Sequence, residues 1–141
     1  MTIVGFSLKK ILIDRKEDIK GKVEVKSKIN ITDISEEKVE LLPDKNVLRF
    51  DFEYTITYEP NLATIDFKGH TLILEEPKKA KEIIKEWKKG KKLEEDLRVR
   101  VYNVIFQKCN LKALELEEDF NLPPHLPLPR IQSQTATSYT G

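Results

Sequence analysis

The chain has 141 residues, of which 39% are hydrophobic and 35% are charged, and its 25 Lys and Arg residues nearly balance its 24 Asp and Glu residues. This length and composition suit one globular domain and exclude a disordered chain, and the balanced charge excludes a strong overall field for nucleic acid or anionic lipid. The sequence contains no apolar run long enough to span a bilayer and no basic, apolar signal segment at its start, so we expect a cytoplasmic location.

The first half of the chain predicts four β-strands. Apolar and polar residues alternate over 3–13, 23–31, 48–58 and 63–73, which is the period of a half-buried strand. Within the first range the apolar phase changes across Lys9 and Lys10, which predicts a β-bulge or a bend. Glu59, Pro60 and Asn61 form a turn signal between the last two ranges, so we expect an antiparallel hairpin there.

The period then changes to that of helices. Pro77 suits a first helical position, an apolar stripe runs from Ala80 to Trp87, and Gly90 supplies a stop, which together predict a short amphipathic helix. A longer helix is predicted over roughly 93–118, and it carries two nearly opposite apolar stripes.

A surface helix of a monomer needs only one apolar stripe, so the second stripe predicts a helix-mediated dimer. One stripe of the long helix consists of Val99, Tyr102, Phe106, Cys109, Ala113 and Leu116. The other stripe, which we assign to the oligomer interface, consists of Leu97, Val101, Val104 and Leu111.

The end of the chain is rich in proline. Four prolines between 123 and 129 predict an extended strap over 122–131, with its leucines packed along the body of the protein. Residues 132–141 are rich in Ser and Thr and predict a flexible tail. We therefore expect a single domain over residues 1–131.

The sequence offers no convincing catalytic pair and no metal-binding motif. Cys109 lies on an apolar stripe, which favours a buried, inert thiol, and His70 lies on the polar phase of its strand. The lysines of 78–92 could contact phosphate, but Glu82 and Glu86 are interleaved with them at helical spacing, which favours a solvated, salt-bridged face. We therefore expect a protein that is not an enzyme and that has no cofactor.

Several short motifs resemble the SecB family of export chaperones. The segment from Phe6 to Ile11 is similar to the family's first strand, with its Phe-x-Ile-x-x-Ile pattern, and the segment from Asn103 to Phe106 is similar to the start of its main helix. The interval from Asn103 to the proline-rich end also matches, so the resemblance covers about residues 3 to 131. Residues 107 to 113 depart from it, because Gln and Lys follow Phe106 where the family usually has Pro-Tyr-Ala-Arg.

The resemblance implies an α+β fold in which two C-terminal helices back a four-stranded antiparallel sheet. It also implies an ATP-independent holdase, a homodimer or homotetramer that binds unfolded polypeptides or preproteins in a hydrophobic groove. In that family an acidic strand face docks the export ATPase SecA, and in this chain Asp66 falls there, with Asp14 or Asp18 as further candidates. Since the chain is near neutral, the SecB fold carries over better than the SecA partnership.

We assign the client groove to residues of the third strand, the short helix and the strap. These residues are Phe50, Phe52, Tyr54, Trp87, Leu126 and Leu128. The alternative for each is a place in the chain's own core, above all for Phe50 and Phe52. Two rival functions stay open: an adaptor for one specific partner, for example an antitoxin, and a small-molecule or lipid binder.

Overall fold

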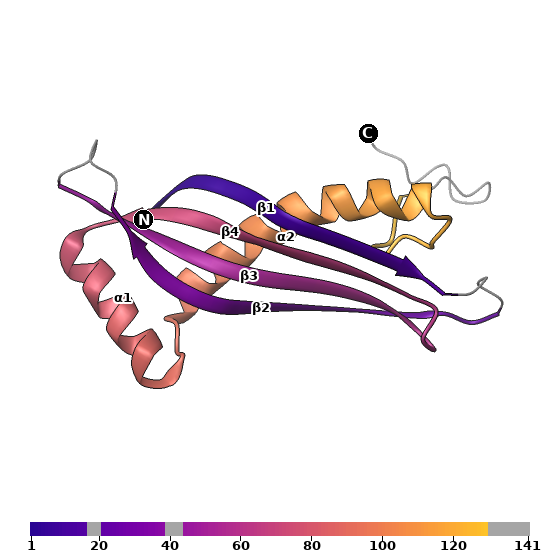
Figure 1. The fold of residues 1–141 in the computed structure, drawn as a ribbon, viewed down its shortest axis with the longest axis horizontal. Helices are drawn as coiled ribbons and strands as arrows, with labels where there is room; N and C mark the ends of the chain where they lie inside the picture. The colour runs from indigo at the N-terminus through magenta and orange to yellow at the C-terminus, as the bar shows by residue number, and fades with distance from the viewer. Residues whose placement is uncertain (17–20, 39–43, 130–141) are drawn as a thin grey trace, which may run out of the picture.

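The computed structural model describes residues 1–16, 21–38 and 44–129, and it confirms the predicted α+β architecture. Four strands precede two helices in the chain, and all neighbouring strands are antiparallel in the order β1-β4-β3-β2 (Figure 1). The strands are β1 (Thr2–Arg15), β2 (Glu24–Glu37), β3 (Asn46–Glu59) and β4 (Ala63–Glu75). The helices are α1 (Pro77–Gly90) and α2 (Glu95–Asp119).

The predicted bulge in the first strand is confirmed. The register between β1 and β4 shifts between Leu8 and Lys10, which returns Ile11 to the sheet face that already holds Phe6. A second shift, between Ile31 and Asp33, does the same for Ile34 in β2. The sequence prediction ended this strand at 31, because the bulge interrupts the alternation that marks a strand.

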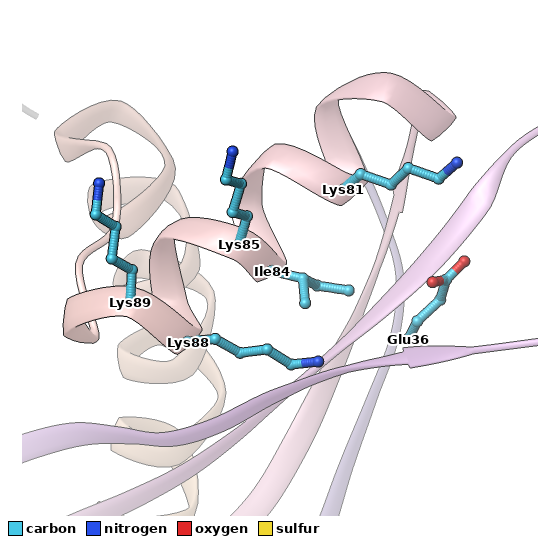
Figure 2. Close-up of a pocket in the computed structure, with 6 residues that line it drawn as sticks. All are labelled: Glu36, Lys81, Ile84, Lys85, Lys88 and Lys89. Carbon is cyan, nitrogen blue, oxygen red and sulfur yellow. The ribbon is translucent and has the colours of Figure 1, made fainter.

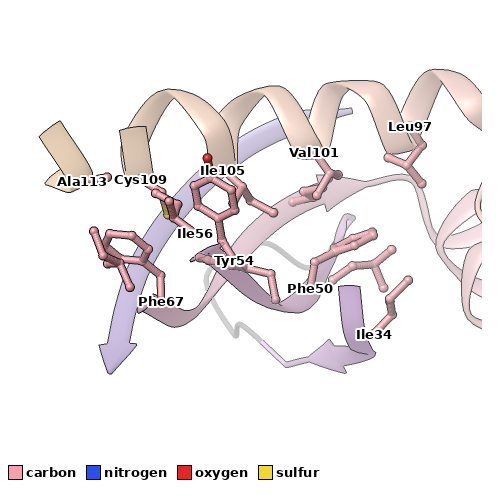
Figure 3. Close-up of a cluster of buried hydrophobic side chains, with 14 of the residues drawn as sticks. Ile34, Phe50, Tyr54, Ile56, Phe67, Leu97, Val101, Ile105, Cys109 and Ala113 are labelled. Carbon is pink, nitrogen blue, oxygen red and sulfur yellow. The ribbon is translucent and has the colours of Figure 1, made fainter. Parts of the chain in front are cut away.

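One face of the sheet forms the core beneath α2. Every second residue of β3 from Leu48 to Tyr58 is at most 1% exposed. The strand is central in the sheet, so the face toward the helix is fully covered, and the other face carries half-buried polar residues such as Arg49 and Asp51. Figure 3 shows the apolar side chains of the sheet packed against those of α2.

The buried residues of α2 form one row of every fourth residue. They are Leu97, Val101, Ile105, Cys109, Ala113 and Glu117. A step of four residues advances the row by about 40° around a regular helix, so the row winds as the helix crosses the twisted sheet. Two residues of each stripe in the sequence prediction therefore belong to this one winding row: Leu97 and Val101 begin it, and Cys109 and Ala113 continue it.

This geometry removes the sequence argument for a helix-mediated dimer. Leu97 is 6% exposed and Val101 is 0% exposed within a single chain. Neither side chain needs a second subunit to leave water. Of the other two residues assigned to an oligomer interface, Val104 is half-buried and Leu111 is 68% exposed.

The short helix α1 has the bounds predicted for it and packs through Ala80, Ile83 and Trp87. Pro77 begins it, as expected, but the left-handed residue that ends it is Lys91 rather than Gly90. The Lys91 amide donates to the Trp87 carbonyl oxygen at 2.8 Å, which satisfies one of the last carbonyls of the helix. Neither helix in the described part of the chain combines the length and the hydrophobicity that crossing a membrane requires.

Candidate functional site

The strap begins at a defined turn after α2. Asn121 adopts a left-handed conformation with φ 53°, its amide donates to the Glu118 carbonyl, and the Leu122 amide donates to the Glu117 carbonyl at 2.8 Å. This pair of hydrogen bonds is the Schellman arrangement that ends many helices. Leu122 is 5% exposed, so the first residue of the strap is anchored in the core before the prolines begin.

A buried polar network then fixes the strap to α2. His125 Nδ1 lies 2.9 Å from Glu117 Oε2 and 3.0 Å from Oε1, and His125 Nε2 lies 2.8 Å from Asn110 Oδ1. The His125 amide also donates to Glu117 at 3.2 Å. The side chains of His125 and Glu117 are each 1% exposed. Because both ring nitrogens face oxygen atoms, both can donate only when the ring carries both protons.

Two tyrosines of β3 extend this network to the sheet. The Tyr54 hydroxyl donates to Asn110 Oδ1 at 2.9 Å. The Tyr58 hydroxyl lies 2.6 Å from Glu117 Oε2 and 2.7 Å from the Pro123 carbonyl oxygen, and its single proton can serve only one of them at a time. Burial raises the pKa of Tyr58 well above its usual value, and the hydrogen bond to Glu117 raises it further. We call the network of Tyr54, Tyr58, Asn110, Glu117 and His125 the strap latch.

An apolar surface continues from the strap latch along α2. Tyr102, Phe106 and Asn110 follow one another at four-residue spacing, so they lie on one side of the helix. Phe106 is half-buried and packs edge-on against Tyr54 at 5.4 Å between ring centroids, and Tyr102 packs edge-on against Phe106 at 6.4 Å. Ile29, also half-buried, is the β2 neighbour of Tyr54 in the sheet.

The strap carries further apolar side chains next to the latch residue His125. Leu126 is 38% exposed and Leu128 is 55% exposed, although the neighbouring His125 is fully enclosed. We group Ile29, Tyr102 and Phe106 with Leu126 and Leu128, which lie on the other side of the hydrogen bond between Asn110 and His125, as the candidate binding surface. It combines half-buried aromatic rings with exposed aliphatic side chains on an anchored segment.

The residues assigned to the client groove divide into two groups in the structure. Leu126 and Leu128 are on the surface, whereas Phe50, Phe52 and Tyr54 are at most 1% exposed and belong to the core under α2. Trp87 is 8% exposed and packs beneath α1, with the Lys91 ammonium 5.9 Å from its ring centroid. Four of the six residues therefore lie in the chain's own core, which was the alternative to a client groove.

Asp66, assigned to partner docking, lies on the sheet face away from α2. Its carboxylate accepts a hydrogen bond from the Thr55 hydroxyl at 2.8 Å. Asp66 is half-buried and stands opposite Leu12 of β1 and Thr55 of β3. Among the described residues, no group of three or more His, Cys, Asp or Glu side chains is arranged to hold a metal ion.

The strap latch was missed by the sequence prediction. No role was predicted from the sequence for His125 or for Glu117. A signal was present, because Glu117 continues the buried row four residues after Ala113, and a carboxylate in such a row needs a polar partner. The partner could not be identified from the sequence, since the Tyr58 hydroxyl comes from a strand 59 residues earlier.

Comparison with known proteins shows the fold. No family model and no curated protein matches the sequence. A solved structure that does match is the Mycobacterium tuberculosis SecB-like chaperone Rv1957, in complex with a ChAD peptide from the Rv1956 HigA1 antitoxin. The two chains are 15% identical, the match covers 93% of this chain and 90% of that chain, and the TM-score is 0.50. The chain therefore has a SecB-like fold, as the sequence resemblance predicted.

Proposed function

We propose that this chain is a non-enzymatic holdase that binds unfolded segments of other polypeptides on the candidate binding surface. The observation that carries the proposal is the pair of exposed leucines, Leu126 and Leu128, on a strap that a buried network holds in place. Exposed apolar side chains that a protein fixes rather than buries are a common mark of an interaction site.

The physical basis is burial of apolar surface without a demand for a particular sequence. Removing a leucine side chain from water contributes roughly 1.5–3 kcal/mol when burial is complete, so the two part-exposed leucines contribute about 1 kcal/mol each. The strap latch orders the strap before a client arrives, which lowers the entropy that binding must overcome. The half-buried rings of Tyr102 and Phe106 offer further area for apolar side chains of any shape.

A second function, an adaptor for one partner, is supported by a different observation. The structural neighbour Rv1957 was solved with a peptide from an antitoxin, which is one specific polypeptide. The same surface on this chain would serve such a partner if its side-chain pattern matched Ile29, Phe106 and the strap leucines. Docking of a SecA-type protein at Asp66 also remains a proposal.

The test is suppression of aggregation of several chemically unfolded, unrelated clients, followed by light scattering without ATP. We expect the wild-type protein to suppress scattering, and we expect Leu126→Ser with Leu128→Ser to weaken client binding by roughly 30-fold, since about 2 kcal/mol of burial is removed. Both residues are exposed, so the fold should persist, and circular dichroism on the same samples checks this.

The matched control is Val99→Ser with Leu111→Ser, which removes two apolar side chains from the far side of α2, where they are 46% and 68% exposed. We expect this variant to hold clients as well as the wild-type protein does. Failure to suppress aggregation of any client would reject the general holdase. Equal losses in both variants would show that the strap leucines form no particular site.

A further inference from the structure

A groove of about 530 Å³ lies between α1 and the end of β2, outside the candidate binding surface. Ile84 forms its apolar floor, Glu36 lies on the β2 side, and four lysines line it from α1 (Figure 2). The lysines are Lys81, Lys85, Lys88 and Lys89. The helix α1, which carries the four lysines, lies at the opposite end of the molecule from the strap (Figure 1).

The lysines of this groove keep their charge unpaired in the part of the chain that the structure describes. The sequence favoured a face salt-bridged by Glu82 and Glu86, but among the described residues none of the four lysines forms an ion pair. Glu82 and Glu86 instead line a separate hollow with Lys79, Lys92 and Leu93. The two glutamates of α1 therefore line a different hollow from the four lysines, and that hollow has lysines of its own.

The floor of the groove adds a second requirement for a ligand. Ile84 is half-buried and lies between the buried stripe of α1 and the stems of Lys81 and Lys88, which are themselves apolar. A ligand that only carried negative charge would leave this floor uncovered. A ligand with both acidic groups and an apolar side chain would complement the lysines and the isoleucine together.

These features favour a polypeptide over a nucleic acid. Among the described residues no aromatic side chain lines the groove, and Trp87 of the same helix is 8% exposed and turned into the core, so bases have no ring there on which to stack. Glu36 would repel any anionic group on the β2 side, so a ligand needs hydrogen-bond donors there, and the amide groups of a polypeptide supply them.

We infer that the groove between α1 and β2 binds an acidic segment of a partner protein, with one apolar side chain of that segment on Ile84. The lysines attract the carboxylates and orient the segment, and the isoleucine supplies apolar contact. Such a site gives the protein a docking surface for a folded partner that is independent of unfolded clients.

The experiment measures fluorescence anisotropy of a short labelled peptide of Glu and Asp residues with one central Leu. We expect saturable binding that weakens as the salt concentration rises. Lys81→Glu with Lys88→Glu should lower the affinity by about tenfold or more, because two attractive charges become repulsive. The matched control is Lys22→Glu with Lys108→Glu, which makes the same change of net charge at exposed positions outside the groove.

Three comparisons would overturn the inference. Equal losses in the groove variant and the control variant would show that only net charge matters. Equal binding of an acidic peptide that lacks the central Leu would remove the role of Ile84. Tighter binding of a single-stranded oligonucleotide would identify a general polyanion site. The client assay on the same groove variant separates the two sites, because we expect client holding to be unchanged by it.

Discussion

At the scale of single residues, Cys109 gives a prediction about alkaline pH. Its side chain is fully buried in the winding row of α2, and burial raises the pKa of its thiol to about 12. In the unfolded chain the thiol ionises near pH 9, so between about pH 9 and 12 the unfolded state loses a proton that the folded state keeps. We expect the free energy of unfolding to fall over this range, with Cys109 contributing up to about 1.4 kcal/mol per pH unit.

The measurement compares urea unfolding of the wild-type protein and Cys109→Ala at several alkaline pH values. Tyr58, whose pKa is also raised by burial, acts in the same direction in both proteins, so the difference in slope isolates the thiol. The native thiol should also resist a thiol reagent until the protein unfolds. The same slope in both proteins, or rapid labelling of the native thiol, would contradict the prediction.

Glu117 gives a second prediction at this scale, because its carboxylate is the centre of the strap latch. Glu117→Gln keeps the shape but replaces one of the two acceptor oxygens that face His125 with an NH2 group, so we expect the protein to lose about 1–3 kcal/mol of stability. We also expect faster amide exchange in the strap, since the His125 amide donates to the same carboxylate.

The control for this prediction is the next residue along the chain. Glu118→Gln makes the same chemical change at an exposed position, and we expect its effect on stability to stay within about 0.5 kcal/mol. Chemical unfolding and hydrogen exchange on both variants form the test. If Glu117→Gln behaved like Glu118→Gln, the strap would have to be held by the packing of Leu122 and the prolines.

Residue roles were the part that the sequence predicted least well. The buried thiol of Cys109 was expected from its apolar stripe, and burial is what the structure shows. Whether Phe50, Phe52 and Trp87 are buried within the chain depends on which face of the sheet and of α1 is covered. Local periodicity identifies an apolar face, but it does not say whether that face meets the chain's own helix or a client.

At the scale of elements, the bulge in β1 explains a glycine in β4. Gly69 stands opposite Leu8 of β1 and Phe52 of β3, and a Cβ atom there would collide with the Ser7 carbonyl oxygen. We expect Gly69→Ala to destabilise the protein by about 1–3 kcal/mol, because β1 or the Phe52 ring must move. Thermal unfolding measures the effect.

Gly90→Ala is the comparison for Gly69→Ala. Gly90 ends α1 without a positive φ, and the nearest atoms to an added Cβ are 3.8 Å away on the Lys92 side chain. We expect this change to be neutral or slightly stabilising, since alanine favours a helix. A Gly69→Ala protein as stable as the Gly90→Ala protein would mean that β1 shifts at its bulge without cost.

The elements themselves were predicted well where the pattern was uninterrupted. The bounds of α1 and the bulge of β1 followed from the stripe that begins at Ala80 and from the phase change at Lys9. The sequence did not predict where β2 ends or that the buried residues of α2 form a single row, because each feature departs from a regular period. A bulge in a strand and a winding row on a helix both depend on the twist of the whole sheet.

At the scale of the whole molecule, the SecB-like arrangement was predicted from the order of the elements and a few motifs, and the structure confirms it. The predicted tail over 132–141 lies outside the described residues, and the strap is described as far as Pro129. The order of elements was sufficient for the fold because the hairpin of β3 and β4 and the following helices leave few ways to cover one apolar face.

We expect the chains to associate through one edge of the sheet, because the two edges expose different kinds of residue. The exposed residues of the β2 edge include Glu24, Lys26 and Lys28, which is typical of an edge protected from pairing. The exposed residues of the β1 edge include four apolar ones, and Val4 and Leu12 among them are 48% and 50% exposed. We therefore expect two chains to associate through β1, and light scattering should give a mass of a dimer or a larger even assembly.

Two substitutions distinguish this edge from the outer side of α2, which the sequence favoured. Leu12→Lys places a charge on the β1 edge, and Leu111→Lys places one on the helix, where the leucine is 68% exposed. We expect Leu12→Lys to lower the mass measured by light scattering and Leu111→Lys to leave it unchanged, because a lone exposed leucine on a mostly polar helix face buries too little area for a stable dimer. The reverse result would restore the helix interface, with Leu111 and Val104 as its core, and would leave the β1 edge free for an extended client.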